Sequence, residues 1–216
     1  MFDIHSHRAA PNTIYNLLIQ DIGQFTGLQN QWLSVGIHPW YITDWYSQLA
    51  EIENIALNKN VLAIGECGLD RLIELPITTQ LVVFEAQVRL AERLNKPVIV
   101  HCIKAHNDLI AWKKQRPTTV PLVVHGFDNN RHILEQLLKH DFMISLGSAL
   151  VNVNSNASKS VQYIPVNKLF LETDNANIPI KAVYEAASKR LNCEIDVLQK
   201  QISGNFTQIF GPTNNP

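Results

Sequence analysis

Short apolar runs that end in a histidine or an acidic residue recur along this chain and limit strongly what it can fold into. The runs are rich in β-branched residues, and longer stretches with helical spacing separate them, which is the pattern of βα units around a parallel sheet. Strands covered on both faces require near-continuous apolar character. The runs are residues 2–4, 33–37, 61–64, 98–100, 122–124 and 169–171, and residues 142–146 form a seventh that ends at Gly147.

The stretches between these runs predict helices. In residues 79–94, for example, Leu81, Phe84 and Val88 recur at three- and four-residue steps, so one stripe can pack on a sheet. The expected helices cover residues 44–57, 79–94, 106–114, 131–140, 158–164, 181–191 and 196–202.

Residues 13–19 offer a possible eighth strand, and eight strands with intervening helices predict an α/β fold of the TIM-type (β/α) barrel class. Only about seven residues separate His5 from Thr13, fewer than the dozen or so that a parallel crossover needs. The first βα unit is therefore expected to be shortened or distorted. No linker, repeat or charge run marks a boundary, so residues 1–216 are expected to form a single domain.

The composition favours a compact soluble protein. Apolar residues make up 46% of the chain and charged residues 17%, which supplies enough apolar surface for a sizeable core. The 18 Lys and Arg against 19 Asp and Glu leave a net charge of -1, so no strong overall field attracts nucleic acid or an anionic membrane. The first residues lack the features of a signal peptide, and no apolar run approaches the roughly 18 residues that span a bilayer, so we expect a cytoplasmic protein.

Six side chains that can bind a metal are expected to converge. His5 and His7 are two apart, so on a strand they point to the same face, where two imidazoles can share one ion. That pair alone is a weak signal, but four further candidates fall at the carboxyl ends of separate predicted strands, which surround one mouth in a barrel. Burying four imidazoles and two carboxylates together is costly, and metal coordination is the commonest compensation. The four further candidates at the strand ends are Glu66, His101, His125 and Asp174.

Other residues near these positions have simpler interpretations. The odd number of cysteines, without a Cys-x-x-Cys spacing, predicts free thiols, and strand alternation turns Cys67 and Cys102 away from their neighbours Glu66 and His101 into the packing. His38 closes a strand and is either a contact at the rim or a structural residue. The polar residues 152–160 predict a surface loop, with a substrate-contacting lid as the alternative. Four aromatic residues either stack on a base or pack between helix and barrel: Trp40, Tyr41, Trp45 and Phe127.

Taken together, the motifs resemble the TatD family of metal-dependent hydrolases from end to end. The Gly-Glu-x-Gly-Leu-Asp element at 65–70 and the Glu-Thr-Asp element at 172–174 are far more specific than the histidine pair. The resemblance implies an amidohydrolase-type TIM barrel, two divalent metals and phosphodiester substrates, chiefly DNA. The matching segments are residues 2–7, 36–39, 63–70, 97–101, 124–127 and 171–174, with a closing match at 205–210.

The resemblance also implies roles for individual residues. Asp174, beside the metals, is the candidate to orient or deprotonate the attacking water, and Glu66 is the candidate to bridge the two ions. Asp3 or Asp70 could fix the tautomer of an imidazole or contact substrate. The implied ligands are His5, His7 and Asp174 for one metal, Glu66 for both, and His101 with His125 for the second.

We expect the substrate to be the end of a nucleic-acid strand rather than a duplex. Ile103-Lys104 stands where the family usually has Arg-Asp, and the sequence shows no basic stripe, which disfavours tight duplex binding. We therefore expect a phosphodiesterase or deoxyribonuclease, 3'-5' exonuclease-like on single-stranded DNA or acting on a small phosphodiester, with Zn, Mg or Mn as the metal. No membrane partner is expected. The alternatives are a phosphomonoesterase, a carbonyl hydrolase such as an aminoacyl-tRNA deacylase or amidohydrolase, and a metal-bound partner protein without activity.

Overall fold

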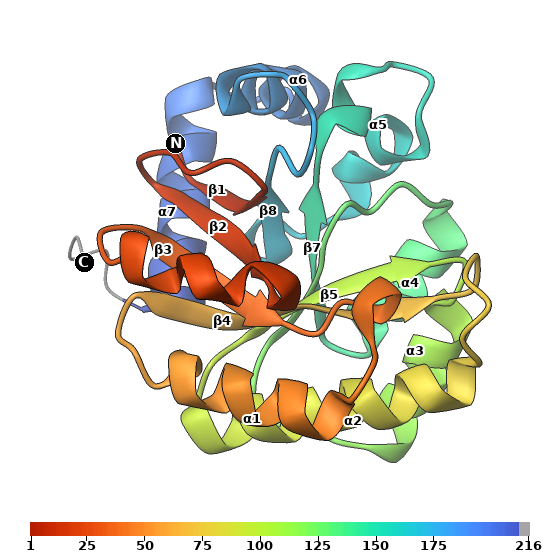
Figure 1. Cartoon of the computed structure of the whole chain (residues 1–216). Helices are drawn as coiled ribbons and strands as arrows, with labels where there is room; N and C mark the ends of the chain where they lie inside the picture. The colour runs from red at the N-terminus through yellow and green to blue at the C-terminus, as the bar shows by residue number, and fades with distance from the viewer. Residues whose placement is uncertain (212–216) are drawn as a thin grey trace.

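The computed structural model describes residues 1–211, and its eight strands form one parallel sheet in sequence order (Figure 1). A parallel bridge between Ser6 and Asp174 joins the end of the last strand to the first, so the sheet nearly closes on itself. The TIM-type barrel and the eighth strand are confirmed. The strands are β1 Asp3–Ser6, β2 Thr13–Leu18, β3 Trp32–Gly36, β4 Val61–Asp70, β5 Val98–Ile103, β6 Leu122–Val124, β7 Phe142–Leu146 and β8 Leu169–Leu171.

Within residues 1–211, seven α-helices and five 3-10 helices connect the strands or follow the last one. Phe84 and Val88 on α2 are buried, as the helical stripe predicts, and α2 ends where Asn95 adopts a left-handed backbone conformation. The helices are α1 Trp45–Ala56, α2 Ile77–Leu94, α3 His106–Gln115, α4 Arg131–Lys139, α5 Asn156–Ser160, α6 Ile180–Leu191 and α7 Ile195–Phe210. The 3-10 helices are η1 Ile19–Gly27, η2 Pro39–Tyr41, η3 Ser148–Val151, η4 Val161–Tyr163 and η5 Val166–Lys168.

The first βα unit contains no helix, as its length predicts. The chain returns from β1 to the start of β2 within residues 7–12, and the N–H of Asp3 donates to the carbonyl of Asn12 at 3.0 Å. The predicted loop at 152–160 is only partly correct, because residues from Asn156 onward form α5 with Ser155 as its N-cap.

Helix α7 packs near the amino ends of several strands, and it runs eight residues beyond the predicted end at 202. Its Phe206 stacks on Phe2, with ring centroids 4.3 Å apart, and contacts Trp32 at the start of β3. The side chain of Asn205 donates to the carbonyl of Leu169 at 3.0 Å. These contacts cover the amino-terminal side and leave the carboxyl ends of the strands for chemistry.

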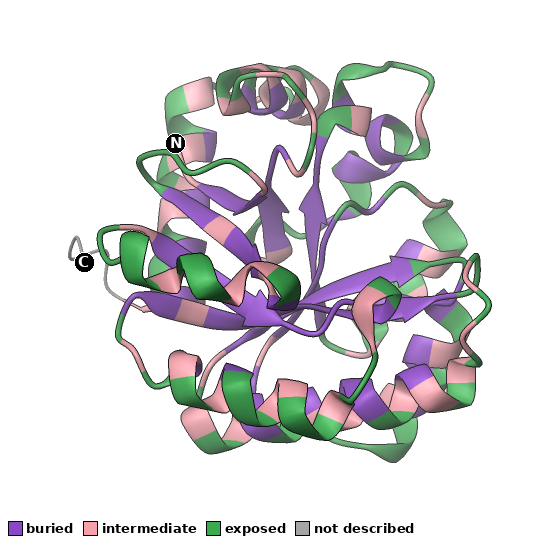
Figure 2. Cartoon of the chain, in the orientation of Figure 1, coloured by how far each residue is buried: buried purple, intermediate pink, exposed green. Residues whose placement is uncertain are grey.

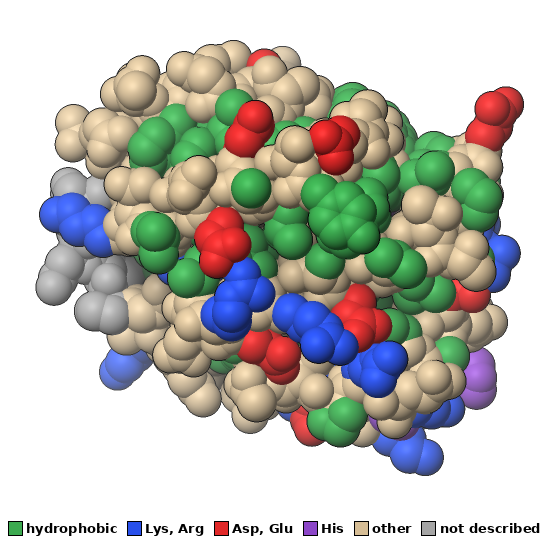
Figure 3. All heavy atoms as spheres, turned by 60° about the horizontal axis from the view of Figure 1, so that its bottom comes forward, with side chains coloured by type: hydrophobic (Ala, Val, Ile, Leu, Met, Phe, Trp, Pro, Cys, Tyr) green, Lys and Arg blue, Asp and Glu red, His purple; other side chains and the backbone are tan. Residues whose placement is uncertain are grey.

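The core follows the strands, which are buried along nearly their whole length (Figure 2). Cys67 and Cys102 lie within it as free thiols, which confirms the packing interpretation, and burial raises the pKa of both. Among residues 1–211 no helix is long and apolar enough to cross a membrane. On the face that carries α1 and α2, acidic and basic side chains lie next to one another (Figure 3), and Arg93 of α2 pairs with Glu53 of α1.

Candidate metal centre

All six predicted ligands meet at the carboxyl ends of the strands. His5 is on β1 and His7 follows it, Glu66 and His101 are on the neighbouring strands β4 and β5, and the other two follow β6 and β8. Five of the six line a cavity of about 220 Å³, with His5 fully buried behind them. The two ligands that follow β6 and β8 are His125 and Asp174, respectively.

Glu66 lies at the centre of this cluster. Its Oε2 is 3.4 Å from His5 Nε2 and 3.7 Å from His7 Nε2. Its Oε1 is 2.7 Å from His101 Nδ1 and 2.8 Å from His125 Nε2. One carboxylate therefore presents a separate oxygen to each of two histidine pairs, which is the arrangement that a bridging ligand requires.

The conformation of β4 depends on the glycines that flank Glu66. Gly65 and Gly68 have φ angles of 138° and 153°, which side chains other than glycine rarely allow. A Cβ atom at Gly68 would also overlap the carbonyl oxygen of His101 on β5. The two glycines thus permit a close approach of β4 to β5, and this approach brings Glu66 beside His101.

Asn16 on β2 fixes the orientation of Glu66. Its Nδ2 donates to Glu66 Oε2 at 3.0 Å, and its Oδ1 accepts a hydrogen bond from the Glu66 N–H at 3.0 Å. Ser34 on β3 donates in turn to the same Asn16 oxygen. The carboxylate is thereby held by the barrel interior and not by the ligands alone.

The backbone of β1 holds Asp174 beside the histidine pair. The Asp174 N–H donates to the carbonyl of His5 at 2.9 Å, and its carbonyl accepts from the His7 N–H at 3.3 Å. Its carboxylate Oδ1 then lies 3.6 Å from His5 Nε2 and 3.4 Å from His7 Nε2. This side chain is 40% exposed, so solvent in the mouth can reach it.

The residues present fit divalent metals. Ligand atoms of His5, His7 and Asp174 lie within 4.8 Å of one another, and so do those of two further groups that share Glu66. Both ring nitrogens of His5 are buried without a hydrogen-bond partner, which is unfavourable unless a cation binds there. Imidazole nitrogens with carboxylate oxygens are ligands suited to Zn and Mn. The two further groups with ligand atoms within 4.8 Å of one another are His5 with Glu66 and His125, and His38 with Glu66 and His101.

The electrostatics of the cluster favour positive charge. Burial and nearby His125 lower the pKa of His5, but Glu66 and Asp174 more than offset them and raise it to about 9. Burial alone would raise the pKa of Glu66, yet His125 and His5 hold it well below its ordinary value. The anionic form of Glu66 is therefore strongly favoured, and bound cations can replace the protons on the histidines.

His38 belongs to the centre, although the sequence left its role open. Its Nε2 lies 3.4 Å from Glu66 Oε1, while its Nδ1 accepts a hydrogen bond from the Trp40 N–H at 3.1 Å. Because Nδ1 uses its lone pair there, a neutral His38 carries its proton on Nε2. In this arrangement the neutral His38 ring presents a hydrogen-bond donor to the centre, although its ring also belongs to one of the three candidate ligand groups.

Glu172 is, like Asn16, a residue of the centre that sequence reasoning missed. It is fully buried, its Oε1 accepts from the Gly126 N–H at 2.7 Å, and the same oxygen is 3.2 Å from His125 Nδ1. This contact directs His125 Nε2 toward Glu66. The available signal was its position at the end of the run 169–171, two residues before Asp174.

The two carboxylates that were candidates to orient an imidazole differ. The hydrogen bonds of the Asp3 carboxylate come from the N–H and the hydroxyl of Thr173 and from the N–H of His5, so they do not support a role for Asp3 in orienting a ring. Asp70 does approach His101, with Oδ2 at 3.4 Å from Nε2.

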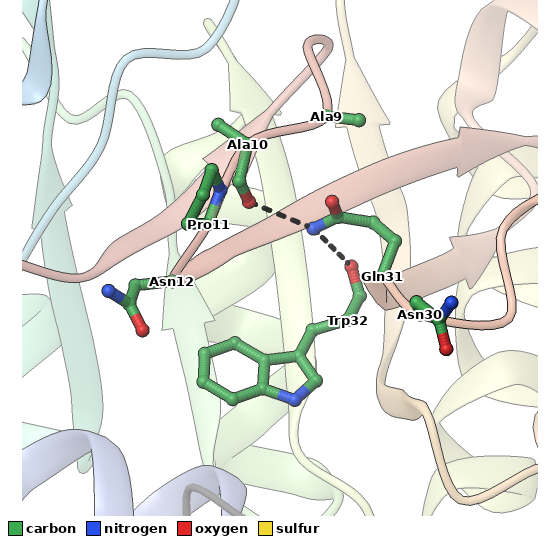
Figure 4. A pocket seen from close by; sticks show the side chains of 7 residues that line it. All are labelled: Ala9, Ala10, Pro11, Asn12, Asn30, Gln31 and Trp32. Carbon is green, nitrogen blue, oxygen red and sulfur yellow. Dashed lines mark hydrogen bonds between the residues drawn. The ribbon is translucent and has the colours of Figure 1, made fainter. Parts of the chain in front are cut away.

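A larger hollow of about 710 Å³ lies beside the connections that enter β2 and β3 (Figure 4). Gln31 spans it, donating to the carbonyl oxygens of Ala10 and Trp32. No His, Cys, Asp or Glu is among the described residues that line it, so it is not a candidate metal centre.

Comparison with known proteins places the chain in a recognised group. The family model described as TatD related DNase matches residues 20–211, a range that includes four of the six candidate ligands and begins after His5 and His7. The chain is 27% identical over 205 residues to the 3'-5' ssDNA/RNA exonuclease TatD of Pantoea ananatis, covering 83% of this chain and 78% of the relative. It is 29% identical over 202 residues to an uncharacterized metal-dependent hydrolase of Buchnera aphidicola, covering 85% and 76%.

A relative with higher identity is matched over a shorter span. The 3'-5' ssDNA/RNA exonuclease TatD of Erwinia billingiae is 34% identical over 149 residues, which cover 66% of this chain and 57% of the relative. Among solved structures, YJJV, a TatD homologue from Escherichia coli, superposes with a TM-score of 0.84 at 20% identity over 98% of this chain and 97% of that one. A TatD family hydrolase from Entamoeba histolytica gives 0.75 at 20% identity, over 93% and 85%.

Proposed function

This chain belongs to the TatD related DNase family of metal-dependent hydrolases, and on that premise we propose that it removes nucleotides from the 3' end of single-stranded DNA with the help of two metal ions. The observation that carries the proposal is the position of Glu66, whose two oxygens face two different histidine pairs inside a mouth of about 220 Å³. A mouth of this size suits a single terminal group. The names of the relatives agree with this substrate class.

The proposed ligands are divided as the family resemblance implies. His5, His7 and Asp174 would hold one ion, His101 and His125 would hold the other, and Glu66 would bind both. When bound, two such ions polarise a phosphoryl oxygen, make a bound water more acidic and stabilise the leaving oxygen.

The chain's own residues supply the remaining steps. The carboxylate of Asp174 is reachable from the mouth and accepts the proton of the attacking water. The Nε2–H of His38, which lies 3.4 Å from Glu66 Oε1, is the donor for a phosphoryl oxygen of the substrate. Glu172 keeps His125 in the tautomer that directs Nε2 to the metal.

The test is a time course with metal-reconstituted protein on single-stranded DNA labelled at the 5' end or the 3' end. We expect a metal-dependent ladder of products shortened from the 3' end, which a chelator abolishes and which Asp174→Asn reduces at least 100-fold while the fold is retained. Protein shown to hold metal that cleaves no DNA with Mg, Mn or Zn would refute the nuclease. Activity on phosphomonoesters or carbonyl substrates would then identify the alternative chemistry.

A further inference from the structure

We propose that Trp40 is the platform on which the base of the terminal nucleotide stacks, and that this chain recognises a strand end by stacking rather than by neutralising phosphates. The inference rests on the proposed function. Aromatic stacking suits single-stranded substrates because every base has a flat face, whatever the sequence.

Two of the four candidate aromatic residues, Trp40 and Tyr41, line the cavity, and Trp40 is the exposed one whereas Tyr41 is half-buried. Trp40 is 59% exposed and lines the same cavity as His38 and His101. Phe127 is buried in the core. Trp45 stacks instead on Tyr46, with ring centroids 3.7 Å apart, on α1.

The indole of Trp40 is held in place before any substrate arrives. Its Nε1–H donates to Asp70 Oδ2 at 2.7 Å, and its backbone N–H donates to His38 Nδ1 at 3.1 Å. The rings of His38 and His101 lie at 90° and 74° to the indole plane, so neither stacks in parallel on it. A fixed ring loses little entropy when a base binds, which favours affinity.

Asp70 connects this platform to the metal centre. The same Oδ2 that accepts the indole N–H lies 3.4 Å from His101 Nε2, and Oδ1 accepts from the Leu72 N–H at 2.8 Å. Asp70 itself is buried. The position of the stacked base is therefore tied to the position of a proposed ligand.

Two of the positive side chains near the mouth, Arg71 and Arg8, are engaged by other groups, whereas Lys104, which follows Ile103, is exposed. None of the described residues that line the cavity is a lysine or an arginine, and Ile103 contributes an apolar side chain. Arg71 forms a two-point contact with Asp108, and Arg8 donates to the carbonyls of Ala176 and Asn175. Binding should then depend weakly on salt, whereas phosphate neutralisation gives a slope of about 0.7 per contact on single strands.

The experiment compares wild type, Trp40→Ala and Trp40→Phe on one single-stranded oligonucleotide with either a normal or an abasic 3'-terminal nucleotide. Trp40→Ala should raise KM for the normal end about tenfold and change kcat less than twofold. The KM of Trp40→Phe for the normal end should lie between those of wild type and Trp40→Ala, because phenylalanine keeps an aromatic ring but loses the hydrogen bond to Asp70. Wild type and Trp40→Ala should have the same KM for the abasic end. Tyr46→Ala, an exposed aromatic on α1, is the matched control and should behave as wild type.

The outcomes separate this inference from the proposed function. An unchanged KM for Trp40→Ala on the normal end, in protein that cleaves DNA, overturns the platform and leaves the nuclease intact. If wild type cleaves no substrate, the nuclease fails, and fluorescence anisotropy of labelled DNA on the Asp174→Asn protein still decides the platform. The stacking platform is overturned if the DNA affinity measured by anisotropy is the same with and without Trp40→Ala. It is also overturned if the logarithm of the affinity falls with the logarithm of the salt concentration with a slope steeper than one.

Discussion

Single atoms decide what each residue of the candidate centre can do. Glu66 presents one oxygen to each histidine pair, and Asn16 holds it from behind. His38 has its donor toward the centre because a backbone N–H occupies its other nitrogen. Glu172 gives His125 the opposite arrangement, with its free nitrogen inward. Two histidines of one cluster are thus assigned different roles by the group on their far side.

The first prediction concerns His38. His38→Ala should lower kcat about 100-fold, as loss of a transition-state donor does, while the protein keeps two metals per chain. Metal content by mass spectrometry and steady-state kinetics measure the two quantities together. His132→Ala, on the exposed surface of α4, is the control. Loss of one metal equivalent would instead make His38 a ligand.

The second prediction concerns Glu172. Glu172→Gln keeps the shape of the side chain but removes the charge behind His125, so metal affinity should fall about 10- to 100-fold. A competition titration with a metal-binding dye measures this. Glu135→Gln removes an exposed carboxylate that pairs with Arg131 and should leave the affinity unchanged. Equal affinities for wild type and Glu172→Gln would contradict the orienting role.

At the scale of elements, β4 and the β1–β8 closure build the centre. Strand β4 runs ten residues, well past the apolar run 61–64, because Gly65 and Gly68 let it continue beside β5. The closure of the barrel at Ser6 and Asp174 brings together the ends of two strands that are distant in sequence. The glycines of β4 and the β1–β8 closure both position the candidate ligands through backbone contacts. Substitution of a nearby side chain therefore need not disturb these positions.

Gly68 and Gly204 offer a matched pair for the third prediction. Gly68→Ala should destabilise the protein by about 3 kcal/mol, since the backbone angle is unsuited to alanine and the new methyl overlaps the His101 carbonyl. Gly204→Ala lies on the exposed face of α7 with nothing within 4 Å, and should stabilise by about 0.5–1 kcal/mol. Urea unfolding measures both. A tolerated Gly68→Ala would refute the tight approach of β4 to β5.

Much of this architecture could be predicted from the sequence, because parallel strands end at one rim and the ligands end the strands. The role of His38 could not, since it depends on the backbone of Trp40. Neither could the length of α7, because Gly204 and Asn205 are poor helix formers, and the Asn205 side chain is held by hydrogen bonds to the distant carbonyls of Val166 and Leu169. Glu172 and Asp174 lie in one tripeptide after β8, and the conformation of the chain there decides which of the two carboxylates faces the mouth. That conformation could not be predicted from the sequence.

At the scale of the whole molecule, one face carries charges of both signs (Figure 3), and the candidate metal centre lies at the carboxyl ends of the strands. Charges of both signs alternate over α1 and α2 (Figure 3), and α7 packs over amino ends of the strands, so the anionic and imidazole groups concentrate at the opposite rim. Stability and metal content are therefore linked through that rim. Metals that bind the folded chain alone shift the unfolding equilibrium.

The fourth prediction follows from that linkage. Removing a metal present at about 100 times its Kd should cost about 2.7 kcal/mol and lower Tm by roughly 5–10 °C in a domain of this size. Differential scanning calorimetry with and without a chelator measures the shift. Glu66→Gln should show much less of it, because the shared ligand is weakened. The same Tm in both conditions for wild type would mean that the cluster holds no metal.

The joining of Ser6 to Asp174 also has a consequence for biosynthesis. Glu66, His101 and His125 have all been translated once residue 125 is made, but the partner of His5 and His7 comes 49 residues later. A growing chain can therefore assemble one half of the centre well before the other. Under the proposed mechanism hydrolysis requires both halves, so we expect it to begin only after the last strand has closed the barrel.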